Sequence, residues 1–224
     1  MGTQITEHFF EHNGRKYFRG KAEDVELASY GQKKAELSKD PYLAIQNKVK
    51  SEHLTDRVKG VGSVAVAWDT TSKADIGARG FLNVFGVKGE RAVEMSYDEA
   101  KKGKVKLVGF TIDEGKLRTM LNTEADGARK YLESEGKDGR VVSKAWVAML
   151  AEMADSFSAS AGYRVSANVQ GIGLDIIAEG GTKGSQKITL SKGTMFAYGL
   201  HKVKDWNKEK TKIENLEDDF YGMT

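Results

Sequence analysis

The sequence predicts an α+β fold, in which strands joined by tight turns pack with a few helices. Three observations support this prediction: an Asn13-Gly14 pair between two strand-like segments, an unbroken polar and apolar alternation over Ser156–Gln170, and an amphipathic helical pattern over Asp113–Glu135. Alternation with a period of two is typical of a strand, whereas apolar residues spaced by three and four are typical of a helix. A chain of 224 residues is long enough to bury a core between such elements.

The N-terminal part is expected to contain a hairpin, because an Asn-Gly pair supplies the positive φ angles of a type I′ turn. Residues 31–60 are charged and include the only proline, in Asp40-Pro41, so we expect a loop there. A short helix over Tyr42–Val49 is the alternative. The strands expected in this part are Ile5–His12, Arg15–Arg19 and Val25–Tyr30.

The rest of the chain has further strand patterns and one clear helix. Asp113 is the expected N-cap of this helix, and Gly136 is its expected end. Val141–Ala154 fits a helix as well as a strand, and we interpret it as a strand. The apolar stripe of the helix is Leu117, Met120, Leu121, Ala128, Tyr131 and Leu132. The further strands are Val61–Trp68, Gly80–Val87, Val105–Ile112, Ile172–Ala178, Lys187–Leu190 and Thr194–Val203.

The alternating run Ser156–Gln170 is long enough to cross a bilayer as a tilted strand, which takes roughly 9–11 residues. Its polar face has small uncharged side chains and Arg164, as expected for a face that lines water. The alternative is an ordinary half-buried strand, broken into a hairpin at Ala161-Gly162. The apolar face, which would meet lipid as a membrane-spanning strand, consists of Phe157, Ala159, Ala161, Tyr163, Val165, Ala167 and Val169.

A cluster of lysines surrounds a predicted hairpin turn and is the candidate lipid-binding site. Each lysine close to an anionic membrane surface contributes about 1 kcal/mol to binding. The alternative is a solvated turn. Nucleic acid is not an expected partner, because no aromatic residues accompany the lysines and the net charge is only +3. The lysines are Lys101, Lys102, Lys104 and Lys106.

The C-terminal residues 204–224 are predicted to form a short acidic tail beyond a single domain of residues 1–203. The tail has four lysines and six acidic residues. Ile213, Leu216 and Phe220 are spaced like the apolar face of a short helix. Such a short stripe is stable only when it docks, so we expect the tail to cover apolar surface. If the protein inserts strands into a membrane, the docked tail would be autoinhibitory. The alternative is that the tail is the last piece of the core or a partner-binding arm.

The sequence offers no catalytic, metal or cofactor site, so we do not expect an enzyme. Cysteine is absent, which excludes thiolate ligands and nucleophiles. His8 and His12 are four residues apart, but in a strand this spacing is too wide for one metal ion. His53 and His201 are isolated and are interpreted as surface or turn residues. The glycines at 180, 181 and 184 do not form a phosphate-binding loop, because no helix follows them.

The segment Ile188–Tyr198 resembles the end of the gasdermin pore-forming domain. This family commonly ends the domain with a short strand, a Lys-Gly step and an apolar strand that finishes in Ala-Tyr or Ala-Phe before basic residues. Here the corresponding residues are Lys192-Gly193, Ala197-Tyr198 and Gly199–Lys204. The resemblance covers residues 105–204, where a strand, an amphipathic helix and long amphipathic strands follow in the family's order. A short tail after this domain is similar to those of short bacterial members.

The resemblance implies a twisted, mainly antiparallel sheet with a few packing helices, whose hairpins extend on activation. Many copies then form a homo-oligomer and one transmembrane pore, which permeabilises membranes in cell death or defence. The protein would be cytoplasmic when inactive and membrane-bound when active, with lipids and an activating protease or protein as partners and without a cofactor. The competing hypothesis is a soluble β-rich binding or assembly module without membrane activity.

Overall fold

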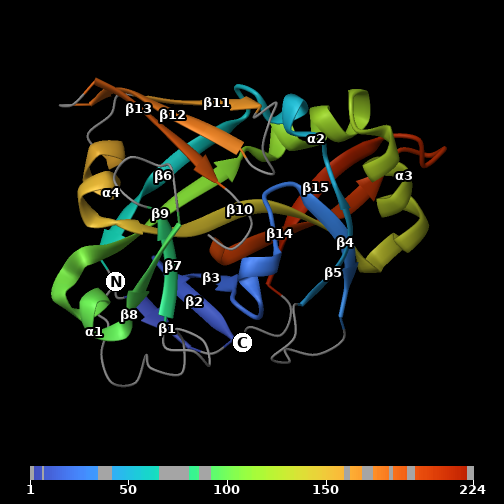
Figure 1. Ribbon diagram of the computed structural model, residues 1–224. Coiled ribbons are helices and arrows are strands. Elements are labelled where there is room, and N and C mark those ends of the chain that lie inside the picture. Colours follow the sequence, from blue (N-terminus) through green and yellow to red (C-terminus); the bar gives the residue numbers. More distant parts are fainter. Residues whose placement is uncertain are drawn as a thin grey trace.

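The computed structural model describes residues 3–6, 8–34, 42–65, 81–85, 92–158, 162–167, 174–181, 184–190 and 195–220. These residues form a strongly curled sheet of twelve strands, a separate sheet of three strands, and helices at the edges of the molecule (Figure 1). Among the described strands the pairs are antiparallel, except for one parallel bridge between Met149 and Phe85. The α+β class and the mainly antiparallel sheet predicted from the sequence are therefore confirmed.

The central path of the large sheet runs in the order β1-β2-β3-β14-β10-β4-β5, and its remaining strands branch from β10 and β14. Its strands are β1 (Thr3–Ile5), β2 (Phe9–His12), β3 (Arg15–Phe18), β4 (Ser29–Lys33), β5 (Leu43–Lys48), β6 (Val58–Ala65), β7 (Phe81–Phe85), β8 (Ala92–Ser96), β9 (Val105–Ile112), β10 (Gly139–Leu150), β14 (Met195–Trp206) and β15 (Ile213–Asp219). The small sheet contains β11 (Gly162–Ala167), β12 (Leu174–Gly181) and β13 (Gly184–Leu190).

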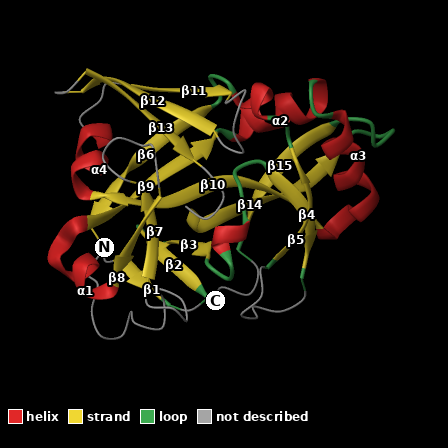
Figure 2. Cartoon of the chain, in the orientation of Figure 1, coloured by secondary structure: helices red, strands yellow, loops and turns green. Residues whose placement is uncertain are grey.

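The helices lie in two groups at opposite ends of the molecule (Figure 2). Two of them are on the side of β4 and β15, and the other two are close to β8, β9 and β10. The α-helices are α1 (Tyr97–Glu99), α2 (Glu114–Thr123), α3 (Asp126–Glu135) and α4 (Ala151–Ser158). The shorter turns are η1 (Ala22–Asp24), η2 (Ser51–Leu54), η5 (Gly136–Asp138) and the π-helical η4 (Ala100–Lys104).

The predicted hairpin at Asn13-Gly14 is confirmed. Asn13 has φ 52° and Gly14 has φ 74°, and His12 pairs with Arg15 across the turn. The continuous strand predicted from Ile5 to His12 is wrong, because the Thr6 hydroxyl accepts a hydrogen bond from the Phe9 N–H at 3.0 Å and turns the chain. This local side-chain bond competes with the extended strand, and β1 folds back onto β2 instead.

The next two predictions in the N-terminal part need correction. A strand was expected at Val25–Tyr30, but Val25 and Leu27 precede β4 as buried residues of an irregular segment. The short helix considered for Tyr42–Val49 is wrong, since this segment contains β5, which pairs with β4. In both places the pairing of β4 with β5 decides the outcome, since their register starts only at Ser29 and Lys48.

The helix predicted over Asp113–Glu135 is two helices, α2 and α3, separated at Glu124-Ala125. Glu124 leaves the helical conformation where its carboxylate is held by Arg57, whose Nη1 lies 2.8 Å from Oε2. The apolar stripe faces the core as predicted, with Leu117, Met120 and Leu132 fully buried. Gly136 ends the second helix with φ 56°, which also agrees with the prediction.

The largest correction concerns residues 141–170. Val141–Ala154 is a strand only as far as Leu150, where β10 ends and α4 begins. The uninterrupted strand predicted for Ser156–Gln170 is wrong, because α4 continues to Ser158 and β11 starts at Gly162. The helix forms because Met153, Ala154 and Phe157 have helical spacing and all enter the core.

The C-terminal segment is a strand and not the predicted helix. β15 pairs antiparallel with β14, and its Ile213 and Leu216 are buried. Phe220, the third residue of the predicted stripe, follows the strand and is 46% exposed. β14 extends across the expected boundary at residues 203 and 204, and β15 belongs to the same sheet.

The core has two parts, one on each face of the central strands. The larger part lies against α2, α3 and α4 and includes Phe110, Leu117 and Phe157. The smaller part collects aromatic residues from β2, β3, β10 and β14, with Trp146 at its centre. Val84 of β7, Met95 of β8 and Ala100 of η4 also belong to this smaller part.

Candidate functional site

The predicted lipid-binding lysines lie on η4 and at the start of β9. The segment is a helical turn with a kink at Gly103, where φ is 76°, and not the predicted hairpin turn. Lys101, Lys102 and Lys104 are exposed. Lys104 pairs with Glu99 at 3.6 Å, whereas Lys106 on β9 has its Nζ 2.5 Å from Oδ1 of Asp155 on α4. The structure therefore brings the four lysines together but joins one of them to α4.

Helix α4 lies beside β9, β10 and β6 at one side of the sheet (Figure 1). It buries Met153, Ala154 and Phe157, each at most 1% exposed. Its outer side faces solvent, and there Asp155 makes the ion pair with Lys106. A helix of eight residues is too short to be stable alone. Its conformation therefore depends on these few contacts with the sheet.

The residues of the predicted membrane-spanning strand are divided between several parts of the chain. Phe157 is in α4 and is fully buried, so it does not share a strand with the others. Tyr163, Val165 and Ala167 lie in β11, where Val165 is opposite Ile176 of β12. The three remaining residues of this prediction lie outside the described residues: Ala159, Ala161 and Val169.

The hairpin β7–β8 has a weak connection to the large sheet. Its two strands pair with each other over five positions, but the bridge between Phe85 and Met149 is its single pairing with β10 among the described strands. Val84 and Met95 are buried against the aromatic part of the core, near Trp146. The hairpin therefore covers this aromatic core while sharing little backbone hydrogen bonding with the strands beneath it.

The C-terminal strand β15 is held by side chains from β10, β14 and α2. Arg140 of β10 pairs with Asp219 at 2.6 Å between Nε and Oδ2, and both side chains are at most 3% exposed. Lys144 pairs with Asp218 at 2.6 Å. From α2, the Asn122 amide donates to the Ile213 carbonyl and accepts from the Ile213 N–H, both at 2.9 Å. The predicted docking of the acidic tail thus occurs through cations and an amide as well as through apolar burial.

Two buried polar side chains near β15, those of Ser143 and His201, are not identified by the sequence analysis. His201 was interpreted as a surface or turn residue, but it is 4% exposed, with Nδ1 2.5 Å from Oγ of Ser143 and Nε2 3.4 Å from Oδ1 of Asp218. Burial lowers the pKa of the His201 imidazole, although the Asp218 carboxylate acts in the opposite direction. Ser143 is fully buried, so its hydroxyl does not reach a substrate in this conformation. The sequence does contain a signal for this burial, because His201 lies within the apolar strand predicted at Thr194–Val203.

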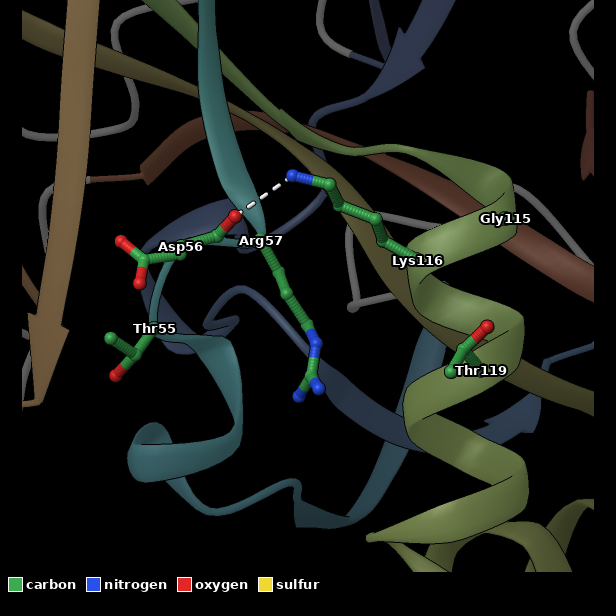
Figure 3. Close-up of a pocket in the computed structure, with 6 residues that line it drawn as sticks. All are labelled: Thr55, Asp56, Arg57, Gly115, Lys116 and Thr119. Atoms are coloured by element: carbon green, nitrogen blue, oxygen red, sulfur yellow. Dashed lines mark hydrogen bonds between the residues drawn. The ribbon is translucent and has the colours of Figure 1, made fainter.

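A pocket of about 360 Å³ lies between the turn before β6 and the start of α2 (Figure 3). The Nζ of Lys116 donates to the Asp56 carbonyl at 2.8 Å, and the carboxylate of Asp56 points away from this lysine. The Arg57 guanidinium is bound to Glu124, whose pKa it lowers by hydrogen bonding. Both cations are therefore already engaged. The pocket is lined by Thr55, Asp56, Arg57, Gly115, Lys116 and Thr119.

Two common kinds of functional element do not occur in the described ranges. Among these residues no group of three or more histidine, aspartate or glutamate side chains is arranged to hold a metal ion. No helix in the same part of the chain is both long enough and apolar enough to span a membrane.

Comparisons of the chain with protein-family models, with characterised proteins and with solved structures found no match. A proposal for the function therefore rests on the sequence patterns and on the contacts in the structure.

Proposed function

We propose that this chain is a gasdermin-like pore-forming protein, which oligomerises on membranes and inserts β-hairpins to permeabilise them. The proposal rests on one observation: the strand-like sequence pattern of Ser156–Gln170 disagrees with the structure of this segment. Ser156–Gln170 alternates like one long strand, yet its first residues belong to helix α4 and its middle belongs to β11. A segment whose sequence fits a strand better than the fold it occupies supports a protein with two conformational states.

Helix α4 is the segment that we propose to convert into strand. If Ala151–Ala167 became one strand, its length would exceed the roughly 9–11 residues that cross a bilayer. The conversion requires Met153 and Phe157 to leave the core, which costs roughly 1.5–3 kcal/mol for each large side chain. The partly exposed pair between Lys106 and Asp155 adds about 0–1 kcal/mol to this cost. The helical state is thus favoured until membrane contact or oligomerisation offsets the loss.

The hairpin β7–β8 is the second segment that we propose to insert. Among the described strands it has one bridge to β10, so few of the backbone hydrogen bonds found there must break before it separates from the sheet. Its departure would expose the aromatic core around Trp146, and this apolar surface would then be available for contact with lipid or a second copy.

The lysine segment lies between these two parts of the chain, since η4 follows β8 and leads into β9. Lys101, Lys102 and Lys104 are exposed and would meet anionic headgroups, Lys104 after it leaves Glu99. Lys106 becomes available when its surface ion pair with Asp155 of α4 opens. We propose lipids and further copies of this chain as partners, with a cytoplasmic inactive state and a membrane-bound active state.

Dye release from liposomes that contain anionic lipid tests this function. The full chain is added to vesicles with and without anionic lipid, and release is measured together with the oligomeric state after detergent extraction. Release with a large oligomer is expected. A chain that binds a protein partner but releases no dye at any lipid composition would favour the β-rich binding module instead.

Changing Lys101, Lys102, Lys104 and Lys106 together to glutamine is expected to weaken binding to anionic liposomes by several kcal/mol, at about 1 kcal/mol for each lysine. Thermal stability should change little, because the three η4 lysines are exposed and the Lys106 pair is at the surface. Sedimentation with vesicles measures the binding. Unchanged sedimentation would show that these four lysines do not contribute to lipid binding.

A matched control replaces lysines elsewhere on the surface. Lys130 and Lys202 are in exposed ion pairs on α3 and β14, away from η4. Their change to glutamine also lowers the positive charge. It should leave sedimentation with anionic liposomes close to that of the unaltered chain.

A further inference from the structure

The strand β15 lies at an edge of the large sheet. Among the described strands it pairs with β14 alone. An edge strand can pair with a strand of another molecule, and proteins commonly cover such edges or place charges on them. The contacts on the outer side of β15 therefore bear on how copies of this chain associate.

A side chain of helix α2 takes the place of a neighbouring strand at the start of β15. The Asn122 amide donates to the Ile213 carbonyl and accepts from the Ile213 N–H, both at 2.9 Å. These two backbone groups point away from β14, because the hairpin closes one position earlier, with the bond from the Asn207 N–H to the Lys212 carbonyl. In an antiparallel pair, one residue of an adjacent strand would make the same two bonds to Ile213.

A second side chain of α2 extends this cover. Arg118 is four residues before Asn122, so both lie on one side of the helix. The Arg118 guanidinium donates to the Glu214 carbonyl at 2.6 Å. The neighbouring Leu117 and Leu121 are buried in the core and hold the helix in place. The backbone of two consecutive residues of β15 is thus bonded to α2 where an added strand would lie.

The charges around Ile213 are self-complementary. If two copies paired antiparallel through this edge, with Ile213 opposite Ile213 of the second copy, Lys212 of each copy would be opposite Glu214 of the other. Both of these charged side chains are exposed. Opposite charges across a strand pair stabilise the pair. A second copy of this chain is therefore the occupant that fits the edge once it is uncovered.

We infer that Arg118 and Asn122 form an edge guard, which keeps β15 of one copy from pairing with β15 of a second copy. Without the guard, the Ile213 N–H and carbonyl would bond to water or to a strand, and the second copy offers both bonds together with two pairs of Lys212 and Glu214. The interface is short, so the dimer is weak and forms at high protein concentration. Because both copies use the same edge, association stops at the dimer.

The consequence of the guard for membranes rests on the proposed function, since the guard would keep copies separate until they assemble on lipid. The pairing itself does not require a membrane. It is therefore tested with the free protein in solution.

Sedimentation velocity of the full chain at increasing concentration tests the guard. The double variant Asn122→Ala and Arg118→Gln should shift from monomer to dimer, with a dissociation constant at least about tenfold below that of the unaltered chain. Leu117→Ala is the matched control, because it destabilises the same helix through a fully buried side chain and leaves both guard residues in place. This control should stay monomeric.

An exchange of charges identifies the pairing. In the double variant, Glu214→Lys places a lysine opposite Lys212 of the other copy, which should raise the dissociation constant at least about tenfold. Lys212→Glu added to it makes the charges opposite again and should restore the dimer. Dimerisation that is equally strong with and without Glu214→Lys would overturn the pairing through β15.

A folded double variant that stays monomeric at every concentration would overturn the guard. If the double variant does not fold, Asn122→Asp serves instead, because its carboxylate can still accept from the Ile213 N–H while the Ile213 carbonyl is released. A smaller shift toward the dimer is expected, and its absence would also overturn the guard. Liposome release separates the two proposals: dimerisation without dye release at any lipid composition contradicts the pore and leaves the guard intact.

Discussion

Val165→Lys is expected to abolish dye release from liposomes, whereas Ser166→Lys is expected to retain most of it. The two positions are adjacent in the alternating run, so in an inserted strand they face lipid and water respectively. A lysine on the lipid face costs about 2–4 kcal/mol near the middle of the bilayer. Because every copy in an oligomer carries the change, this cost multiplies with the number of copies.

Lysine is the informative charge here because of the register of β11. Ser166 is opposite Asp175 of β12, a residue that is 3% exposed. An aspartate at position 166 would place like charges across the strand pair and destabilise the folded protein before any membrane is met. Lysine at this position faces an opposite charge instead.

Both variants must remain folded for the comparison to hold. Circular dichroism and unfolding in denaturant provide this control, and sedimentation shows whether each variant still binds vesicles. Both should bind, because η4 and its lysines are unchanged. Equal loss of dye release in two folded, vesicle-bound variants would contradict the assignment of opposite faces.

Elements with strong local signals could be predicted from the sequence. The hairpin at Asn13-Gly14 and the helix end at Gly136 depend on residues that adopt positive φ without a large penalty, and both occur as predicted. β9 has the predicted bounds, Val105–Ile112. In each case the residues that decide the structure are neighbours in the chain.

Helix α4 could not be predicted because its residues fit both the spacing of a helix and the alternation of a strand. Met153 and Phe157 are four apart and fit a helix, while Phe157 is also part of the alternation that continues to Gln170. The choice between them is made by packing against β9 and β10. This ambiguity is also what makes α4 the proposed converting segment.

The C-terminal strand was misinterpreted for a different reason. Ile213 and Leu216 are three apart, which in a regular strand would place them on opposite faces. The β14–β15 ladder has register shifts between Val203 and Asp205 and between Asp205 and Trp206, and both apolar side chains are buried. The partners of the acidic residues, Arg140 and Lys144, are distant in the sequence, so no local pattern reveals them.

Asp219→Ala is expected to lower the free energy of unfolding by about 3–5 kcal/mol, because it leaves the Arg140 guanidinium buried without its carboxylate. The remaining acceptors of Arg140 are the carbonyls of Lys137 and Gly139, which carry no full charge. Unfolding in guanidinium chloride measures the loss. Glu217→Ala is the matched control on the same strand, since its pair with Lys202 is exposed and should change the value by about 0–1 kcal/mol.

The Asp219→Ala variant also distinguishes between two possible roles of β15. If the strand restrains hairpin insertion, Asp219→Ala should release dye faster and oligomerise more readily on liposomes than the unaltered chain. If β15 only completes the sheet, the variant should lose stability without gaining membrane activity. The double variant Arg140→Leu and Asp219→Leu removes both charges and should recover most of the stability. On the restraint hypothesis it should also return dye release to the original rate, and rapid release from this stable double variant would contradict a restraint by the Arg140–Asp219 pair.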